Sequence, residues 1–255
     1  MKKITTRQIV TILATLLTIT VNGLANALPL NGQGTGEISD RFDIYFVPAG
    51  YVFSIWGLIY LGLIAFAIYQ AMPAQRENEV IKKISPAYWM SNLANTAWIF
   101  LWHYEFFALT LIAMFILLAS LLYIYVQLRG SSSSLGSAQK WFVNTPFSIY
   151  LGWISVATIA NVSQVLFFLG WGAWGISPAA WAVILLAIAT VLGMLMLWRE
   201  TDRPYALVLV WAIVGIAKSQ ADTALVANSS WIAVGALVLA LVVMPFLQPK
   251  SSLRG

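Results

Sequence analysis

Eight apolar segments, each about twenty residues long, occupy most of the chain and limit what it can fold into. We place them at residues 8–28, 49–72, 85–104, 106–128, 145–168, 177–198, 204–221 and 229–248. About twenty apolar residues in a helix cross the hydrocarbon core of a bilayer. A helix satisfies its own backbone hydrogen bonds in lipid, and these segments lack the alternation expected of barrel strands. The sequence therefore predicts an all-α, polytopic bundle of eight membrane helices.

The composition supports a membrane protein and excludes several kinds of site. Hydrophobic residues make up 60% of the 255 residues and charged residues 9%, and the mean hydropathy is +0.82. A soluble domain carries about a quarter charged residues. The chain has no cysteine and one histidine, His103, so disulfides, thiolate metal ligands and cysteine nucleophiles are excluded. We expect no metal site and no catalytic residues, and we interpret His103 and Glu105 as solvated residues of a tight turn.

The basic residues predict the topology. With the N-terminus inside, 12 of the 14 basic residues fall on one side of the membrane, Arg41 lies outside and Lys218 lies within a segment. The positive-inside rule then places both termini in the cytoplasm. The net charge of +5 follows from this topology and does not indicate a nucleic-acid partner. We expect an integral protein of a bacterial cytoplasmic membrane. The inner set is Lys2, Lys3, Arg7, Arg76, Lys82, Lys83, Arg129, Lys140, Arg199, Arg203, Lys250 and Arg254.

The first segment has two interpretations. Lys2 and Lys3, an apolar run and the small residues around Asn26 also fit a signal peptide that is cleaved after about residue 27. The run is about twenty residues, however, and a signal core is usually about 7–15. We expect a retained helix, and the mass of the purified chain would distinguish the two cases.

The tryptophans divide by depth. Of the 12 in the chain, eight lie near segment ends, where an interfacial belt explains them. From the outer ends, Trp56 lies roughly 10 Å deep, Trp98 about 9 Å, Asn95 about 13 Å and Asn161 about 11 Å. These similar depths have two alternative explanations. The four residues line an aromatic pocket beneath residues 29–48, or the asparagines form hydrogen bonds between neighbouring helices. The belt set is Trp89, Trp102, Trp141, Trp171, Trp174, Trp181, Trp198 and Trp231.

Three motifs carry a family resemblance. They read PAGYVFSIWGLIY (48–60), NTAWIFLWHYEFFALTLIAMFILL (95–118) and WISVATIAN (153–161). Together they resemble the second to fifth helices of the tryptophan-rich sensory protein, or translocator protein, family, also called peripheral-type benzodiazepine receptor proteins. The resemblance implies a five-helix bundle at residues 1–170, with residues 171–255 as a three-helix extension. The extension would cover one side of the bundle or form a homodimer contact.

The resemblance also implies a pocket and its residues. Family members bind porphyrins, sterols and synthetic aromatic ligands, so a hydrophobic small molecule such as a porphyrin or haem-type ligand is the implied partner besides the lipid bilayer. Pro48 and Gly50 would shape the corner that enters the second helix. The implied ligand-binding residues are Tyr51, Trp56, Tyr60, Asn95, Trp98, Trp153, Ala157 and Asn161.

Several functions stay open at this point. A sensor or transporter of a flat hydrophobic molecule is one. A secondary transporter of a small polar solute is another, although it predicts ionisable residues near the membrane midplane, of which the sequence has almost none. A membrane scaffold without a ligand is a third. An enzyme is a fourth, since some relatives are reported to promote porphyrin breakdown.

Overall fold

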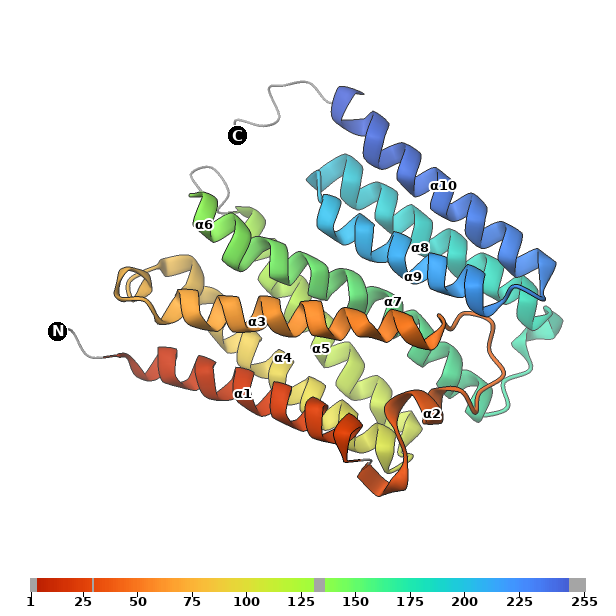
Figure 1. The fold of residues 1–255 in the computed structure, drawn as a ribbon, viewed down its shortest axis with the longest axis horizontal. Helices are drawn as coiled ribbons and strands as arrows, with labels where there is room; N and C mark the ends of the chain where they lie inside the picture. Colours follow the sequence, from red (N-terminus) through yellow and green to blue (C-terminus); the bar gives the residue numbers. More distant parts are fainter. Residues whose placement is uncertain (1–3, 29, 131–135, 248–255) are drawn as a thin grey trace. The chain divides into compact units, whose positions relative to one another are not determined.

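The computed structural model describes residues 4–28, 30–130 and 136–247, and within these residues it is helical without strands (Figure 1). Short helices include α2 (Thr35–Ser39), α6 (Ser137–Gln139) and the 3₁₀-helix η2 (Gly50–Ser54). Each of the eight predicted segments coincides with a long helix. These are α1 (Thr6–Ala27), α3 (Ile55–Ala71), α4 (Glu79–His103), α5 (Phe107–Gly130), α7 (Thr145–Phe168), α8 (Pro178–Glu200), α9 (Arg203–Ser219) and α10 (Ala224–Leu247).

Six helices in the described part of the chain are long and apolar enough to cross a membrane: α1, α3 with η2, α5, α7 with α6, α8 and α10. The chain is an integral membrane protein. The other two long helices do not meet this standard: polar residues such as Asn92 and Asn95 lower the hydropathy of α4, and α9 has 17 residues. The count of eight crossings therefore stays a prediction. Lys2, Lys3, Lys250 and Arg254 of the charge pattern lie outside the described residues.

Local sequence signals explain where several helices begin. Thr5 and Gln8 form a reciprocal capping box at the start of α1. The side chains of Asn78, Ser177 and Asp202 accept backbone N–H bonds at the starts of α4, α8 and α9. Each such cap satisfies donors that the first helical turn leaves unpaired. These bonds stabilise the first turn of each helix and so determine where the helix starts.

The chain forms two compact units. Unit 1 comprises residues 1–41 and 56–151, and unit 2 comprises residues 42–55 and 152–255. Unit 1 contains α1, α4, α5, nearly all of α3 and the first turns of α7. Unit 2 contains the rest of α7 and helices α8, α9 and α10. The division near residue 170 into a five-helix bundle and a three-helix extension stays a prediction.

Unit 1 has a polar interior seam. Helix α1 packs on α4 (Figure 1) and buries Thr11, Thr15, Thr18 and Asn22 on its inner face, whereas leucines such as Leu13 are exposed. This distribution is opposite to that of a water-soluble helix and suits lipid, where interhelical hydrogen bonds and close packing hold helices together. Helix α1 is thus an integral part of unit 1.

Unit 2 is held by close approaches at glycines. Helices α8, α9 and α10 pack on one another (Figure 1). A methyl group built on Gly193 of α8 would lie 2.7 Å from Leu237 of α10, and one on Gly152 of α7 would lie 3.2 Å from the Tyr205 carbonyl of α9. Small residues permit such close packing of membrane helices. A methyl group at either position would have to displace its neighbour, so glycine allows the closest packing at these two contacts.

Candidate functional site

In unit 1, three of the predicted ligand-binding residues meet around a tyrosine that the sequence analysis did not select. Trp56 stacks on Tyr60 with ring centroids 5.5 Å apart, and its ring meets Tyr150 edge-on at 5.9 Å. The Asn95 amide nitrogen donates to the Tyr150 hydroxyl at 2.9 Å. Tyr150 and Asn95 are buried, while Trp56 and Tyr60 are partly exposed. We call Trp56, Tyr60, Asn95 and Tyr150 the aromatic–amide cluster.

A second asparagine extends this cluster into α1. The Asn22 amide nitrogen donates to the Asn95 side-chain oxygen at 2.7 Å, so Asn95 is fixed by one bond on each end of its amide. Further along α1, the hydroxyls of Thr15 and Tyr88 lie 2.6 Å apart. An unsatisfied polar group in lipid costs several kcal/mol, so these reciprocal bonds hold Asn95 in one orientation.

The sequence contains a signal for this seam that the motif comparison did not use. Polar residues recur along the first segment at spacings of three and four, which places them on one face of a helix. All of these residues are buried. The side-chain amide nitrogen of Gln8 donates to the backbone carbonyl of Gln70 in α3 at 2.8 Å. The stripe consists of Gln8, Thr11, Thr15, Thr18 and Asn22.

Trp98 lies elsewhere on α4 and stacks on Trp102 at 5.1 Å with nearly parallel rings. Trp102 is buried, and its indole N–H donates to the Thr35 carbonyl of α2 at 3.1 Å. The interfacial interpretation of Trp102 is therefore wrong, because the segment containing α2 covers this end of α4. Trp98 therefore packs beside the α2–α4 contact through its stack on Trp102.

The interpretation of His103 as a solvated turn residue is also wrong. His103 is fully buried; its Nδ1 lies 2.9 Å from the Ile99 carbonyl and its Nε2 lies 3.3 Å from the Thr35 hydroxyl. The Asn31 side-chain amide also donates a hydrogen bond to the backbone carbonyl of His103 at 3.0 Å. The loop after α1 covers the ring, and the apolar sequence around His103 gave no sign of this.

Glu105, by contrast, is at the surface. Its carboxylate accepts hydrogen bonds from Gln33 at 3.1 Å and Arg41 at 3.0 Å. These two bonds, with the positive charge of Arg41, lower the pKa of the Glu105 carboxyl below its ordinary value. The loop between α1 and η2 is thereby tied to the α4–α5 turn in unit 1.

In unit 2, the predicted corner packs on α9. The Ala49 N–H donates to the Gly215 carbonyl at 3.1 Å, and Pro48 and Val52 lie directly against Gly215. Gly50 begins the 3₁₀-helix η2. The absence of a side chain at Gly215 lets this corner reach the α9 backbone.

Two aromatics of the corner meet two tryptophans of unit 2. Tyr51, which is half exposed, meets Trp211 of α9 edge-on at 5.5 Å, and Trp211 donates to the Val52 carbonyl at 3.1 Å. Phe53 meets the buried Trp153 of α7 edge-on at 5.8 Å. Trp153 and Trp211 each follow a proline by seven residues. The corner is thus held by one tryptophan of α7 and one of α9.

Ala157 and Asn161 follow Trp153 along one face of α7, at intervals of four residues. Asn161 is buried and Ala157 is partly buried. Apart from Trp98, the predicted ligand-binding residues therefore lie in two groups, one in each unit. That they line a single ligand pocket stays a prediction.

Comparison with known families agrees with the motifs. No curated protein and no solved structure matches the chain. A family model described as TSPO-like protein matches residues 8–243. The match confirms the resemblance to the translocator protein family. It also includes α8, α9 and most of α10, which the three motifs did not reach. The chain therefore belongs to the TSPO-like protein family.

Proposed function

We propose that this membrane protein binds a flat, largely apolar molecule of the tetrapyrrole or sterol class and acts as a sensor or transporter of it. The observation that carries the proposal is the aromatic–amide cluster, in which buried amide and hydroxyl groups are held beside partly exposed rings. Apolar walls with a few fixed polar groups are typical of small-molecule sites. Membership of the TSPO-like family supports the same conclusion.

The polar groups of the cluster favour binding over other functions. Asn22, Asn95, Tyr60 and Tyr150 are uncharged side chains, whereas coupled transport of a polar solute depends on ionisable groups near the midplane. Amides and phenols orient a ligand by hydrogen bonds but are weak acids and bases near neutral pH. We therefore propose ligand recognition, with Trp56 and Tyr60 as stacking surfaces.

A titration with protoporphyrin tests the proposal. We expect quenching of tryptophan fluorescence and a shift of the porphyrin absorption band when the full chain is titrated in lipid nanodiscs. Trp56→Ala removes a stacking ring and should weaken binding by about threefold to tenfold. Trp198→Ala, at a tryptophan that is 68% exposed, is the matched control and should bind like the wild type.

Two results would contradict the proposal: no spectral response in the wild type, or equal affinities for the Trp56→Ala and Trp198→Ala variants. Ala157→Phe extends the test to unit 2. If the predicted residues of α7 belong to the same site, this larger side chain should reduce protoporphyrin binding at least as much as Trp56→Ala does.

We also propose that all eight long helices cross the membrane, with both termini in the cytoplasm. Because the chain has no cysteine, single cysteines can report the topology. Ala74→Cys, between α3 and α4, should react with an impermeant maleimide only after the cells are opened. Ala221→Cys, between α9 and α10, should react in intact cells. Both positions are exposed. Labelling of the two from the same side would contradict the eight-span topology.

A further inference from the structure

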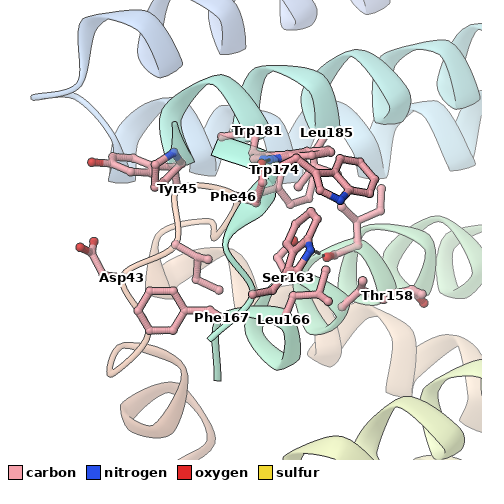
Figure 2. A pocket seen from close by; sticks show the side chains of 17 residues that line it. Asp43, Tyr45, Phe46, Thr158, Ser163, Leu166, Phe167, Trp174, Trp181 and Leu185 are labelled. Carbon is pink, nitrogen blue, oxygen red and sulfur yellow. Dashed lines mark hydrogen bonds between the residues drawn. The ribbon is translucent and has the colours of Figure 1, made fainter. Parts of the chain in front are cut away.

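Unit 2 contains a pocket that none of the predicted site residues lines. It has a volume of about 500 Å³ and lies between residues 43–46, the C-terminal half of α7 and the N-terminal half of α8 (Figure 2). Cavities of about 300–1,000 Å³ accommodate drug-sized ligands. Every lining residue belongs to unit 2, so the pocket is complete within one compact part of the structure.

The pocket is lined by residues of α7 other than the predicted site residues, and its central lining residue points away from Trp153. Val162 lines the pocket and follows Trp153 by nine residues. At about 100° per residue, nine residues amount to half a turn around the helix axis. Thr158 and Leu166, which also line the pocket, are one turn away from Val162 on each side. Helix α7 thus directs Trp153 and Val162 to opposite sides, whereas Asn161 lies only about 60° around the axis from the lining residue Thr158.

Indole rings form one wall of the pocket. The rings of Trp171, Trp174 and Trp181 contact one another in all three pairs, with centroids 5.2, 5.3 and 5.8 Å apart. Their mutual contact leaves no space for a cation among them, so they act as a continuous apolar surface. The Trp181 indole is fixed by donating to the Ala173 carbonyl at 3.0 Å. Phe46 and Phe167 add rings from two other segments, as Figure 2 shows.

The backbone holds one of these indoles in an unusual place. Ala173 and Trp174 both have positive φ angles, 51° and 52°, which non-glycine residues seldom adopt. The Trp174 side chain is nonetheless at the pocket edge and 79% exposed. Burial within the described chain therefore does not explain why this large ring is held there. The membrane interface accounts for an exposed indole between two membrane helices, and a ring-containing ligand stacked on Trp174 would also cover its apolar surface.

The charge of the lining restricts the ligand further. The hydroxyls of Thr158 and Ser163 donate to carbonyls of α7 itself. Among the lining residues the charged side chain is Asp43, which is exposed at the rim, and lysine, arginine and histidine do not contribute. A carboxylate ligand would be repelled by Asp43 and would have no basic side chain of the lining to pair with. This disfavours fatty acids and the propionates of a porphyrin.

We propose that this pocket is a second ligand site, which takes a neutral, lipophilic, ring-containing small molecule. The aromatic walls favour stacked rings over a flexible acyl chain. The lining of this pocket includes none of the residues of the aromatic–amide cluster, so this proposal and the proposed tetrapyrrole or sterol site can fail independently.

Photolabelling tests this proposal directly. 4-Phenylbenzophenone is neutral, carries several rings and inserts into nearby C–H bonds when irradiated. With the full chain in phosphatidylcholine nanodiscs, we expect saturable labelling of pocket residues such as Val162, Leu166 and Leu185, identified by mass spectrometry. Bilayer lipid is in excess throughout, so saturation indicates that the probe binds the pocket in preference to lipid. Excess biphenyl should suppress the labelling, and excess hexadecanoic acid should not.

Two variants test whether the probe labels the chain from within the pocket. Trp174→Ala should raise the half-saturating probe concentration by about threefold to tenfold, since it removes a stacking surface. Ser163→Leu should reduce labelling because it fills the pocket. Trp198→Ala is the matched exposed-tryptophan control, and Ala157→Phe tests the other face of α7; both should label like the wild type.

Several results would overturn the proposal. Non-saturable labelling, or labelling no greater than that of the exposed residue Phe115 on α5, would show that the probe reports only lipid exposure. Displacement by hexadecanoic acid as effective as that by biphenyl would identify an acyl-chain groove. Equal responses of Trp174→Ala and Trp198→Ala would also contradict the site. The biphenyl competition needs no variant, so the outcome does not depend on their folding.

Discussion

The corner formed by Pro48, Ala49 and Val52 should depend on the missing side chain at Gly215. A Cβ atom built on Gly215 lies 2.2 Å from Val52 Cγ2 and 3.0 Å from Pro48 Cβ. Ordinary van der Waals contact begins near 3.4 Å, so Gly215→Ala requires Val52 to move about 1.2 Å. Neither neighbour is the flexible end of a long side chain, because valine is stiff at χ1 and proline is a ring.

The cost can be worked out from three contributions. Overpacking a well-filled interior costs about 1–3 kcal/mol. Displacing the corner also weakens the 3.1 Å bond from Ala49 to the Gly215 carbonyl, which contributes about 1 kcal/mol. Alanine offsets about 1 kcal/mol by its better helix propensity. We therefore expect Gly215→Ala to lower the free energy of unfolding by about 1–3 kcal/mol.

Thermal unfolding of the purified chain in detergent, followed by circular dichroism, measures this effect. Gly235→Ala in α10 is the matched control, since a methyl group there meets no atom within 4 Å. The control should be neutral or slightly more stable than the wild type. The cost of Gly215→Ala should fall in a Val52→Ala background, where the clashing Cγ2 is absent. If Gly215→Ala is as stable as Gly235→Ala, the corner does not approach α9 as described.

Two further predictions concern unit 1. Asn95→Leu leaves the Asn22 amide and the Tyr150 hydroxyl without their shared partner, so we expect a loss of about 1–3 kcal/mol in thermal unfolding, whereas Asn26→Leu near the end of α1 should have little effect. Glu105 has a lowered pKa in the folded protein, so its contribution to stability is present above its ordinary value of 4.5 and is lost as the pH falls below it. Cleavage of the loop at residues 30–45 by an acid-active protease should therefore accelerate below that pH in the wild type, and Glu105→Gln should cleave faster at neutral pH with a flatter pH profile. The effect will be small because both partners of the Arg41–Glu105 pair are nearly half exposed.

The helices could be predicted from the sequence because lipid imposes a simple rule. A segment of about twenty apolar residues must be helical there, and all eight predicted segments are long helices in the structure. The third segment begins six residues earlier than predicted, at Glu79 and not at residue 85, because Asn78 caps a charged first turn. Apolar composition does not report such caps, so the boundary was missed.

Contacts between helices were harder to predict than the helices themselves. Asn95 was selected for its depth and motif position, but its partners Asn22 and Tyr150 were not. The stripe from Gln8 to Asn22 was visible as spacing, yet spacing alone does not say which helix it faces. His103 was misjudged for a related reason, since its burial depends on a loop some seventy residues away in the chain.

The tryptophans show most clearly that the depth of a residue along a helix does not predict which side chains it contacts. Trp171, Trp174 and Trp181 lie near helix ends and suit a membrane interface, but they also contact one another and line a pocket. Depth along a helix gives one coordinate, and the direction of a side chain around the axis gives the other. On α7 that second coordinate separates Trp153 from Val162 by half a turn. An indole at the membrane interface can therefore contact lipid, line a ligand pocket or do both. The side chains around it, and not its depth along the helix, determine which of these contacts it makes.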